Sequence, residues 1–211
     1  MKPPLRHLPP PRAQGPSAFT TFLQDLQSGC PGCRSVAFVD REGEAVDYAG
    51  RGDEFDIKVA AAHWRIILEE AGALPGGIAR RIIIDNSRRS YVIERLPEGY
   101  ALVLICSGRA AFQVSERALS ACVRGLCREA GFQTERPIAT WVPVEVYPRH
   151  PRRRRPEWAH VDGGWQAVDV LGVLMGLRPS ERGYRVRLAG GAEVTLVREP
   201  LGHWWMDDEL D

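Results

Sequence analysis

The sequence predicts an α+β domain followed by a small all-β domain. In the first part, apolar stripes typical of helices alternate with β-favouring runs joined by short polar turns. The order reads α-β-β-α-β-β-β-α, and such short turns favour an antiparallel sheet. From Thr134 onward, prolines punctuate the chain, and five short strand-like runs separated by glycine-containing turns follow. Runs of that length and spacing predict a small barrel or curled sheet.

The first part opens with a helix, a hairpin and a second helix. Ser17 is placed to cap the first helix, whose apolar stripe consists of Phe19, Phe22, Leu23 and Leu26. A polar turn containing Gly43 joins two β-favouring runs, 33–40 and 44–49. The second helix is expected over residues 54–73, before a proline-glycine break.

Three strands and a third helix complete the first domain. We expect the strands at 78–85, 91–96 and 100–106, and the helix at 113–129. The solid apolar run Ile82–Ile84 suits a strand that is covered on both faces.

The second helix carries two apolar faces on a helical wheel. A broad arc, wide enough to pack on a sheet, contains Ile57, Ala60, Ala61, Trp64, Ile67, Leu68 and Ala71. The far side carries a narrow stripe of Val59, Ala62 and Ile66. The charged or polar residues bordering this stripe are Lys58, Arg65 and Glu69 on one edge and His63 and Glu70 on the other. A thin apolar stripe with charged rims is typical of a helix-to-helix contact, although single Val and Ala residues are also common on surfaces.

Composition excludes several classes of protein. The 211 residues are 44% hydrophobic with a net charge of +1, which supports globular packing and gives no whole-chain attraction to nucleic acid or membrane. No apolar run reaches the roughly 18 residues of a membrane span, and the amino terminus lacks a signal-peptide core. We expect a cytoplasmic protein with its five cysteines reduced.

Four segments follow from these patterns. Residues 1–16 are predicted to be a disordered, proline-rich basic tail, and residues 17–131 the α+β domain. Residues 132–157 are predicted to be a proline- and arginine-rich linker. Residues 158–211 are predicted to be the small all-β domain, with strands at 158–161, 165–174, 184–188, 192–198 and 203–206.

The first domain resembles the Roadblock/dynein light chain family, and in particular its bacterial, MglB-like members. The phrase L-Q-D-L-Q-S-G-C-P-G-C-R-S-V-A-F-V-D-R-E-G is similar to that family's first helix, its bend and its first hairpin. The phrase P-E-G-Y-A-L-V-L-I-C is similar to the family's turn into its last strand. Cys33 stands where the family commonly has an aliphatic residue.

The resemblance implies a fold and a partner. It implies a five-stranded antiparallel sheet, with the second helix on one face and the first and third helices on the other. It also implies a homodimer with a two-helix platform that binds and regulates a Ras-like small GTPase. In that interpretation the second-helix stripe and its rims form the dimer or partner contact, and Ile82 and Ile84 lie near the strand seam. The family binds no nucleotide itself, so no cofactor is expected.

Two other interpretations remain open. The cluster Arg149, Arg152, Arg153, Arg154 and Arg155 is a possible phosphate-binding patch for nucleic acid, with the C-terminal aromatics as stacking groups. A solvated linker and a tryptophan-rich core are the competing explanations, since the charges of residues 136–211 cancel. The phrase G-Y-R-V-R-L-A-G-G-A-E-V-T-L-V-R-E-P-L-G-H-W-W resembles a small uncharacterised bacterial domain, which assigns no chemistry.

Reactive groups are sparse in the sequence. Cys30 and Cys33 form a C-x-x-C, and Cys122 and Cys127 a second pair, which together suit zinc or thiol chemistry by number. The first pair leads into a strand and the second lies about 140° apart around a helix, so core or loop thiols are the better interpretation. No H-E-x-x-H, G-x-S-x-G or phosphate-loop motif is present, so we expect a non-catalytic protein.

Overall fold

The computed structural model describes residues 15–72, 77–133, 141–147, 155–178, 180–200 and 202–207. The chain divides into two compact units, Met1–Arg136 and Pro137–Asp211. Residues 1–14 of the predicted tail and much of the predicted linker lie outside the described residues. Within those residues, no helix combines the length and the apolar character that crossing a bilayer requires.

The N-terminal unit follows the predicted order of helices and strands. Its elements are α1 (Thr20–Gly29), β1 (Cys33–Val39), β2 (Ala45–Gly50), α2 (Glu54–Gly72), β3 (Arg81–Ile84), β4 (Arg89–Arg95), β5 (Ala101–Ser107) and α3 (Glu116–Ala130). The 3-10 turns η1 (Pro97–Gly99) and η2 (Ala110–Gln113) precede β5 and α3. All the strand pairs are antiparallel, in the order β2-β1-β5-β4-β3. The α+β prediction is confirmed.

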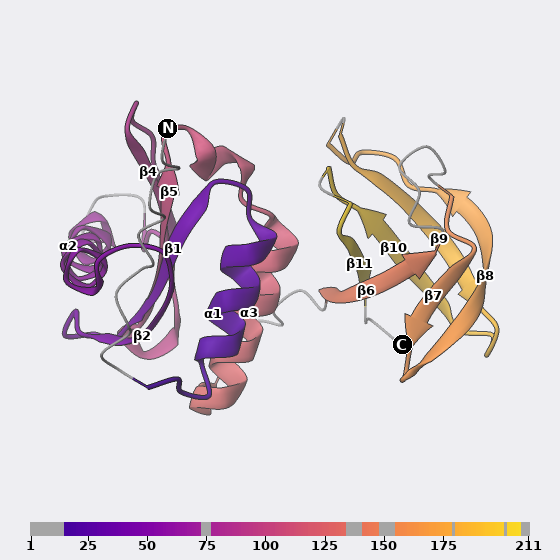
Figure 1. Cartoon of the computed structure of the whole chain (residues 1–211), viewed down its shortest axis with the longest axis horizontal. Coiled ribbons are helices and arrows are strands. Elements are labelled where there is room, and N and C mark those ends of the chain that lie inside the picture. Colours follow the sequence, from indigo (N-terminus) through magenta and orange to yellow (C-terminus); the bar gives the residue numbers. More distant parts are fainter. Residues whose placement is uncertain are drawn as a thin grey trace, which may run out of the picture. The chain divides into compact units, whose positions relative to one another are not determined.

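Helices cover both faces of this sheet. Figure 1 shows α2 alone on one face, and α1 and α3 side by side on the other. Ala37 and Val39 of β1 face the α2 side, where they join a buried apolar cluster. The alternate residues Val36 and Phe38 face the α1 and α3 side and are equally buried. Burial on both faces explains why β1 and β5 read as nearly continuous apolar runs.

The start of α1 is anchored differently from the expectation. Ser17 does not cap the helix by position, because the N-cap is Phe19, which makes no side-chain cap bond. The Ser17 hydroxyl instead donates to the carboxylate of Asp47, and the Thr20 hydroxyl donates to the same oxygen at 2.6 Å. Asp47 is fully buried in β2, so these donors compensate for the loss of water around a charge. The contact joins the first helix to the sheet.

The C-terminal unit is a closed barrel of six strands. These are β6 (Trp141–Tyr147), β7 (Trp158–Val161), β8 (Gly164–Val173), β9 (Arg182–Leu188), β10 (Glu193–Arg198) and β11 (Trp204–Asp207). They close in the order β10-β11-β6-β7-β8-β9 (Figure 1). Inward-facing residues such as Val186 and Leu196 are fully buried.

Strand β6 lies within the stretch that the sequence assigned to the linker. Its alternating Val142, Val144 and Val146 pack against the barrel core. Pro143 made the segment resemble a linker, because proline cannot donate to a strand ladder. The pairing explains why it is tolerated: β6 pairs with β11 over 141–144 and with β7 over 145–147, so Pro143 has a neighbour on one side only.

Candidate functional site on helix α2

Helix α2 buries one face and leaves an apolar stripe exposed, as its wheel predicts. Ile57, Ala61 and Leu68 are buried against the sheet. On the opposite side, Val59 is 50% exposed and Ile66 is 57% exposed. No segment among the described residues covers this stripe, and an exposed apolar stripe of this kind marks a candidate interaction surface.

The exposed stripe is longer than the three residues, Val59, Ala62 and Ile66, that the sequence predicts. Phe55 is 72% exposed and precedes Val59 by one helical turn, so the spacing 55-59-62-66 continues a single line along α2. Ile78 is also exposed and lies beside the end of the helix, since a Cβ on Gly72 would lie 4.0 Å from its Cγ2. The wheel signal for Phe55 was present in the sequence. Ile78 lies outside the helix, so no helical pattern marks it.

Ala62 is the least exposed member of the stripe. A Cβ on Gly43 would lie 3.7 Å from the Cα and Cβ of Ala62, so the β1–β2 turn lies against this part of α2. Gly43 has φ of +90°, a conformation that favours glycine. The hairpin turn therefore narrows the stripe at its middle.

The two rims of the stripe differ in structure. Lys58 pairs with Glu54 at 2.7 Å and lies 5.8 Å from the centre of the Tyr48 ring, which holds it on the hairpin side. His63 and Glu70 are exposed on the other rim. This second rim is the one that faces solvent without a covering hairpin.

Arg65 is not a surface residue, contrary to the prediction that it borders the stripe. It is only 6% exposed, and its Nε donates to the carbonyl oxygen of Gly99 at 2.7 Å. Its Nη1 pairs with Glu69, which also accepts from Arg95. The Arg95 guanidinium, and then that of Arg65, hold the pKa of Glu69 below its ordinary value of 4.5. These contacts connect α2 to the sheet. Arg65 therefore fixes the position of the helix and is not part of its exposed surface.

Strand β3 forms one of the two edges of the sheet, and β2 forms the other. Ile82 and Ile84 are half-buried and pack against the α2-side core. Ile83 points to the other face and is exposed, so the expectation that all three are covered on both faces is wrong. The physical reason is the strand order, because β3 has β4 as its neighbour on one side and no described strand on the other.

The predicted basic patch lies mostly outside the part of the chain that the structure describes. Arg149 and Arg152–Arg154 are among the residues not described, and Arg155 is exposed. The aromatic residues divide into two groups. Tyr184 and Trp204 belong to the core of the barrel, and Trp205 is buried outside that cluster, whereas Trp158 and Trp165 are exposed.

The five cysteines are buried, unbridged thiols. Burial raises the pKa of Cys122, and a hydrogen bond to Cys106 together with burial raises the pKa of Cys33. The described residues contain no group of His, Cys, Asp and Glu that suits a metal ion. Cys33 and Cys122 are therefore protonated at neutral pH. They are buried thiols of the core, which is the interpretation that the sequence favours.

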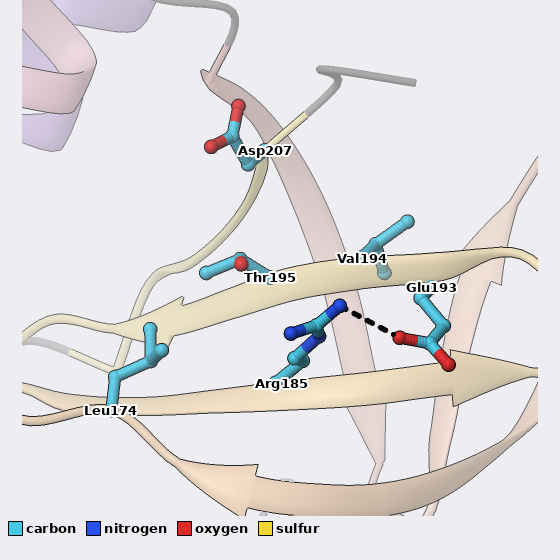
Figure 2. Close-up of a pocket in the computed structure, with 6 residues that line it drawn as sticks. All are labelled: Leu174, Arg185, Glu193, Val194, Thr195 and Asp207. Carbon is cyan, nitrogen blue, oxygen red and sulfur yellow. Dashed lines mark ion pairs between the residues drawn. The ribbon is translucent and has the colours of Figure 1, made fainter. Parts of the chain in front are cut away.

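A surface hollow of about 320 Å³ lies on the barrel, and Figure 2 shows its lining. Arg185 points across the hollow toward Glu193, and their ion pair measures 3.0 Å. Arg187 pairs with the same carboxylate at 2.8 Å. The charges of this hollow are therefore largely satisfied within the chain.

Comparison with known proteins yields similarity in fold only. No profile of a known protein family matches the sequence, and no curated protein does. MglB of Myxococcus xanthus is similar over 56% of this chain and 98% of its own, with 14% identity and a TM-score of 0.48. A Roadblock/LC7 domain from Streptomyces avermitilis covers 53% of this chain and 96% of its own, with 12% identity and a TM-score of 0.44.

A third similar structure is the gliding protein MglB from Thermus thermophilus. It covers 56% of this chain and 97% of its own, with 15% identity and a TM-score of 0.42. In the chain itself, α2 lies on one face of the five-stranded sheet and α1 and α3 lie on the other. This arrangement of helices and strands is the one that the sequence resemblance to the Roadblock family implies.

Proposed function

We propose that this chain is a non-catalytic adaptor that forms a homodimer through α2 and β3 and binds a Ras-like small GTPase on the resulting platform. The observation that carries the proposal is the exposed apolar line along α2 from Phe55 to Ile66. A surface helix without a partner would present polar residues there. The sequence resemblance supplies the class of partner.

The spacing of the stripe suits contact with a second copy of the same helix. Its positions 55, 59, 62 and 66 follow one another at four, three and four residues, which is the spacing of a coiled-coil seam. A twofold axis across this seam would place each stripe against itself, as an isologous interface requires. Exposed His63 and Glu70 would then lie at its rim.

The free edge of β3 supports the same dimer. The Arg95 N–H donates to the Arg80 carbonyl at 2.8 Å, so residue 80 faces β4, and residues 82 and 84 do so by alternation. The backbone groups of Arg81 and Ile83 then point to the open edge. An unpaired edge is a template for another strand. A second copy of β3 would pair there while the two α2 helices meet.

The first experiment measures the oligomeric state. Light scattering at tens of micromolar should give twice the chain mass of 23.5 kDa. Val59→Asp with Ile66→Asp should give a monomer, because two charges would be buried without partners. Leu171→Asp is the matched control, since Leu171 is an exposed apolar residue of the barrel. A wild-type monomer at this concentration would refute the proposed dimer.

The second experiment tests the partner. Small GTPases from the native host, loaded with either GDP or a non-hydrolysable GTP analogue, should include one that binds the wild-type chain in a nucleotide-dependent way. Calorimetry with the purified GTPase should then give one binding event per platform. If no GTPase binds in either nucleotide state while the dimer is intact, the proposed GTPase partner is refuted and the proposed dimer still stands.

A second candidate function is binding of single-stranded nucleic acid by the barrel. The observation that favours it is an exposed aromatic face across three adjacent strands. Tyr147 pairs with Trp158 across β6 and β7, and His160 pairs with Trp165 across β7 and β8. Tyr147, Trp158 and Trp165 are large exposed apolar side chains of the barrel, and His160 is exposed beside them. Bases stack on such rings, and arginines such as Arg155 attract phosphates.

Quenching of tryptophan fluorescence by a single-stranded oligonucleotide tests this candidate. Binding should weaken as salt rises, and Trp158→Ala with Trp165→Ala should abolish it. Arg152–Arg155→Ala should reduce its salt dependence. No quenching at low salt would reject the candidate.

A further inference from the structure

A small basic pocket lies at one end of the sheet, on the side of α2. Its volume is about 80 Å³, and three arginines line it: Arg34, Arg51 and Arg89. They come from the start of β1, the residue after β2 and the start of β4. The buried side chains of Ile57 and Ile105 provide its apolar lining. These arginines are far apart in the sequence, and only the sheet brings them together.

These three guanidinium groups lack a carboxylate partner among the described residues. Nε of Arg34 donates to the Ser107 hydroxyl at 3.3 Å, and the side chains of Arg51 and Arg89 make no described hydrogen bond or ion pair. Most other arginines with described contacts in this unit are neutralised, as Arg65 and Arg95 are by Glu69. In the larger hollow of the barrel, Glu193 neutralises Arg185 and Arg187. Three exposed cations without a carboxylate partner thus line one pocket, where an anion would meet their opposite charge at close range.

The backbone fixes where two of these arginines start. The β1 register shifts between Cys33 and Ser35, so Arg34 occupies a bulge, which redirects its side chain. Gly50 has φ of +115°, and a Cβ there would lie 2.2 Å from the Arg34 carbonyl oxygen. Only glycine allows that approach, and the Arg51 N–H then donates to the same oxygen at 2.8 Å. Arg34 and Arg51 are thereby held side by side.

Arg89 is held by a separate turn. Its backbone N–H donates to Oδ1 of Asn86 at 2.8 Å, so the turn before β4 is closed by a side chain. On the other side of the pocket, the Ser35 hydroxyl donates to the Arg51 carbonyl at 2.7 Å. The three Cα positions are therefore set before any ligand arrives, which lowers the cost of ordering a site.

Two carboxylates also line the pocket, and they limit what it accepts. Oδ1 of Asp53 accepts from the N–H groups of Phe55 and Asp56, at 2.9 and 3.3 Å, and so caps α2. The helix terminus is therefore already occupied, and the attraction for an anion comes from the guanidinium groups. With Asp56 also at the pocket, three positive charges oppose two negative ones. That balance favours a compact anion that contacts all three arginines at once.

We propose that Arg34, Arg51 and Arg89 form a binding site for the phosphate group of a small phosphate monoester. A phosphate presents three acceptor oxygens, and arginine forks bind such oxygens in pairs. The small volume admits one phosphate group, and the apolar lining from Ile57 and Ile105 suits the carbon side of an ester. None of the stripe residues Phe55, Val59, Ala62 and Ile66 lines the pocket, so the proposal does not depend on the proposed dimer or its GTPase.

The test is a two-dimensional NMR titration of the full chain at constant ionic strength. Glycerol phosphate is the ester probe, inorganic phosphate the second arm and chloride the reference anion. Amide shifts should concentrate at residues 34–35, 50–53 and 89–90, with saturation for both phosphates. Tighter binding of the ester supports an ester as the occupant. If inorganic phosphate binds as tightly as the ester or more tightly, the proposal that the ligand is an ester is refuted, and the pocket is a site for free phosphate.

Matched variants decide whether the pocket is responsible. Each of Arg34→Ala, Arg51→Ala and Arg89→Ala should weaken binding about tenfold or more, because each removes a charge-assisted contact. Arg89→Lys should also weaken it, since lysine keeps the charge but loses the fork. Arg41→Ala is the control, because Arg41 pairs with Glu42 in the β1–β2 turn, outside the pocket lining. Unchanged binding in all three pocket variants, or an equal loss in the control, overturns the proposal.

Discussion

The two units of this chain complete their sheets in different ways. The barrel closes on itself, so each of its strands has a neighbour on both sides of the ring. The sheet of the N-terminal unit is open at both edges, β2 and β3, and α2 on one of its faces carries exposed Phe55, Val59 and Ile66. A closed ring satisfies its own backbone groups, whereas an open edge with an apolar helix leaves groups that a second chain can bury. This difference is the basis for placing the proposed dimer contact at β3 and α2.

One carboxylate from each unit illustrates the difference between a buried and an exposed ion pair. In the N-terminal unit, Glu94 of β4 is 2% exposed and accepts from both Arg80 and Arg81. In the barrel, Glu193 pairs with Arg185 and Arg187 on the outer surface. One carboxylate therefore has a structural role within a packed region, and the other lies in solvent.

Removing Glu94 should destabilise the chain more than removing Glu193. Glu94→Ala should cost about 1–3 kcal/mol of the free energy of unfolding, because the buried Glu94 is shared by Arg80 and Arg81, while Arg80 is exposed and Arg81 keeps its pair with Glu116. Glu193→Ala, which also unpairs two arginines, should leave the unfolding midpoint in urea unchanged, because solvent screens its ion pairs. Equal midpoints for the two variants would contradict the distinction between buried and exposed pairs.

Truncating a buried leucine in each unit tests whether they are separate domains. Leu196→Ala in the barrel and Leu104→Ala in the sheet should each cost about 2–5 kcal/mol, since both side chains are fully buried. We expect each variant to lower one of two transitions in differential scanning calorimetry and leave the other in place. A single transition that moves in both variants would show one cooperative unit.

A proline at the open edge should weaken the proposed dimer. Ile83→Pro removes an N–H that points away from β4, so the β3–β4 ladder keeps its hydrogen bonds while pairing with a second copy loses one. We expect the dimer dissociation constant, measured by sedimentation, to rise about tenfold, which corresponds to about 1.4 kcal/mol. Ile83→Thr keeps the N–H and serves as control. No change with proline would place the dimer contact away from this edge.

The smallest effect concerns Glu69, which joins Arg65 and Arg95. Because its pKa is lowered in the folded state, its contribution to stability is present above its ordinary value of 4.5 and is lost as the pH falls through the folded value. Glu69→Gln should cost below about 1 kcal/mol at pH 7, since the side chain is largely exposed, and the difference from wild type should shrink in acid. Glu70→Gln, on the exposed rim, is the control and should show neither effect.

Local patterns predicted much of this structure. The period of α2 correctly separated the buried Ile57 and Leu68 from the exposed Val59 and Ile66, because a helix repeats its faces every few residues. Turn residues such as Gly43 marked the hairpins. The prediction failed for Arg65. A helical wheel gives only the direction of a side chain around the helix axis, and it takes no account of Gly99, which is 34 residues away in the sequence but accepts a hydrogen bond from Arg65. It also missed β6, where a proline obscured an alternating pattern.

The sequence by itself determined the order of elements in the N-terminal unit, the change from an α+β part to an all-β part, and the apolar stripe of α2. Each of these depends on residues close together in the chain, whose periodicity and turn chemistry act locally. Only the tertiary structure decided that β3 lies at an edge, that β6 closes the barrel, and that Arg34, Arg51 and Arg89 share one pocket. These outcomes depend on pairing between distant strands, which no local pattern specifies.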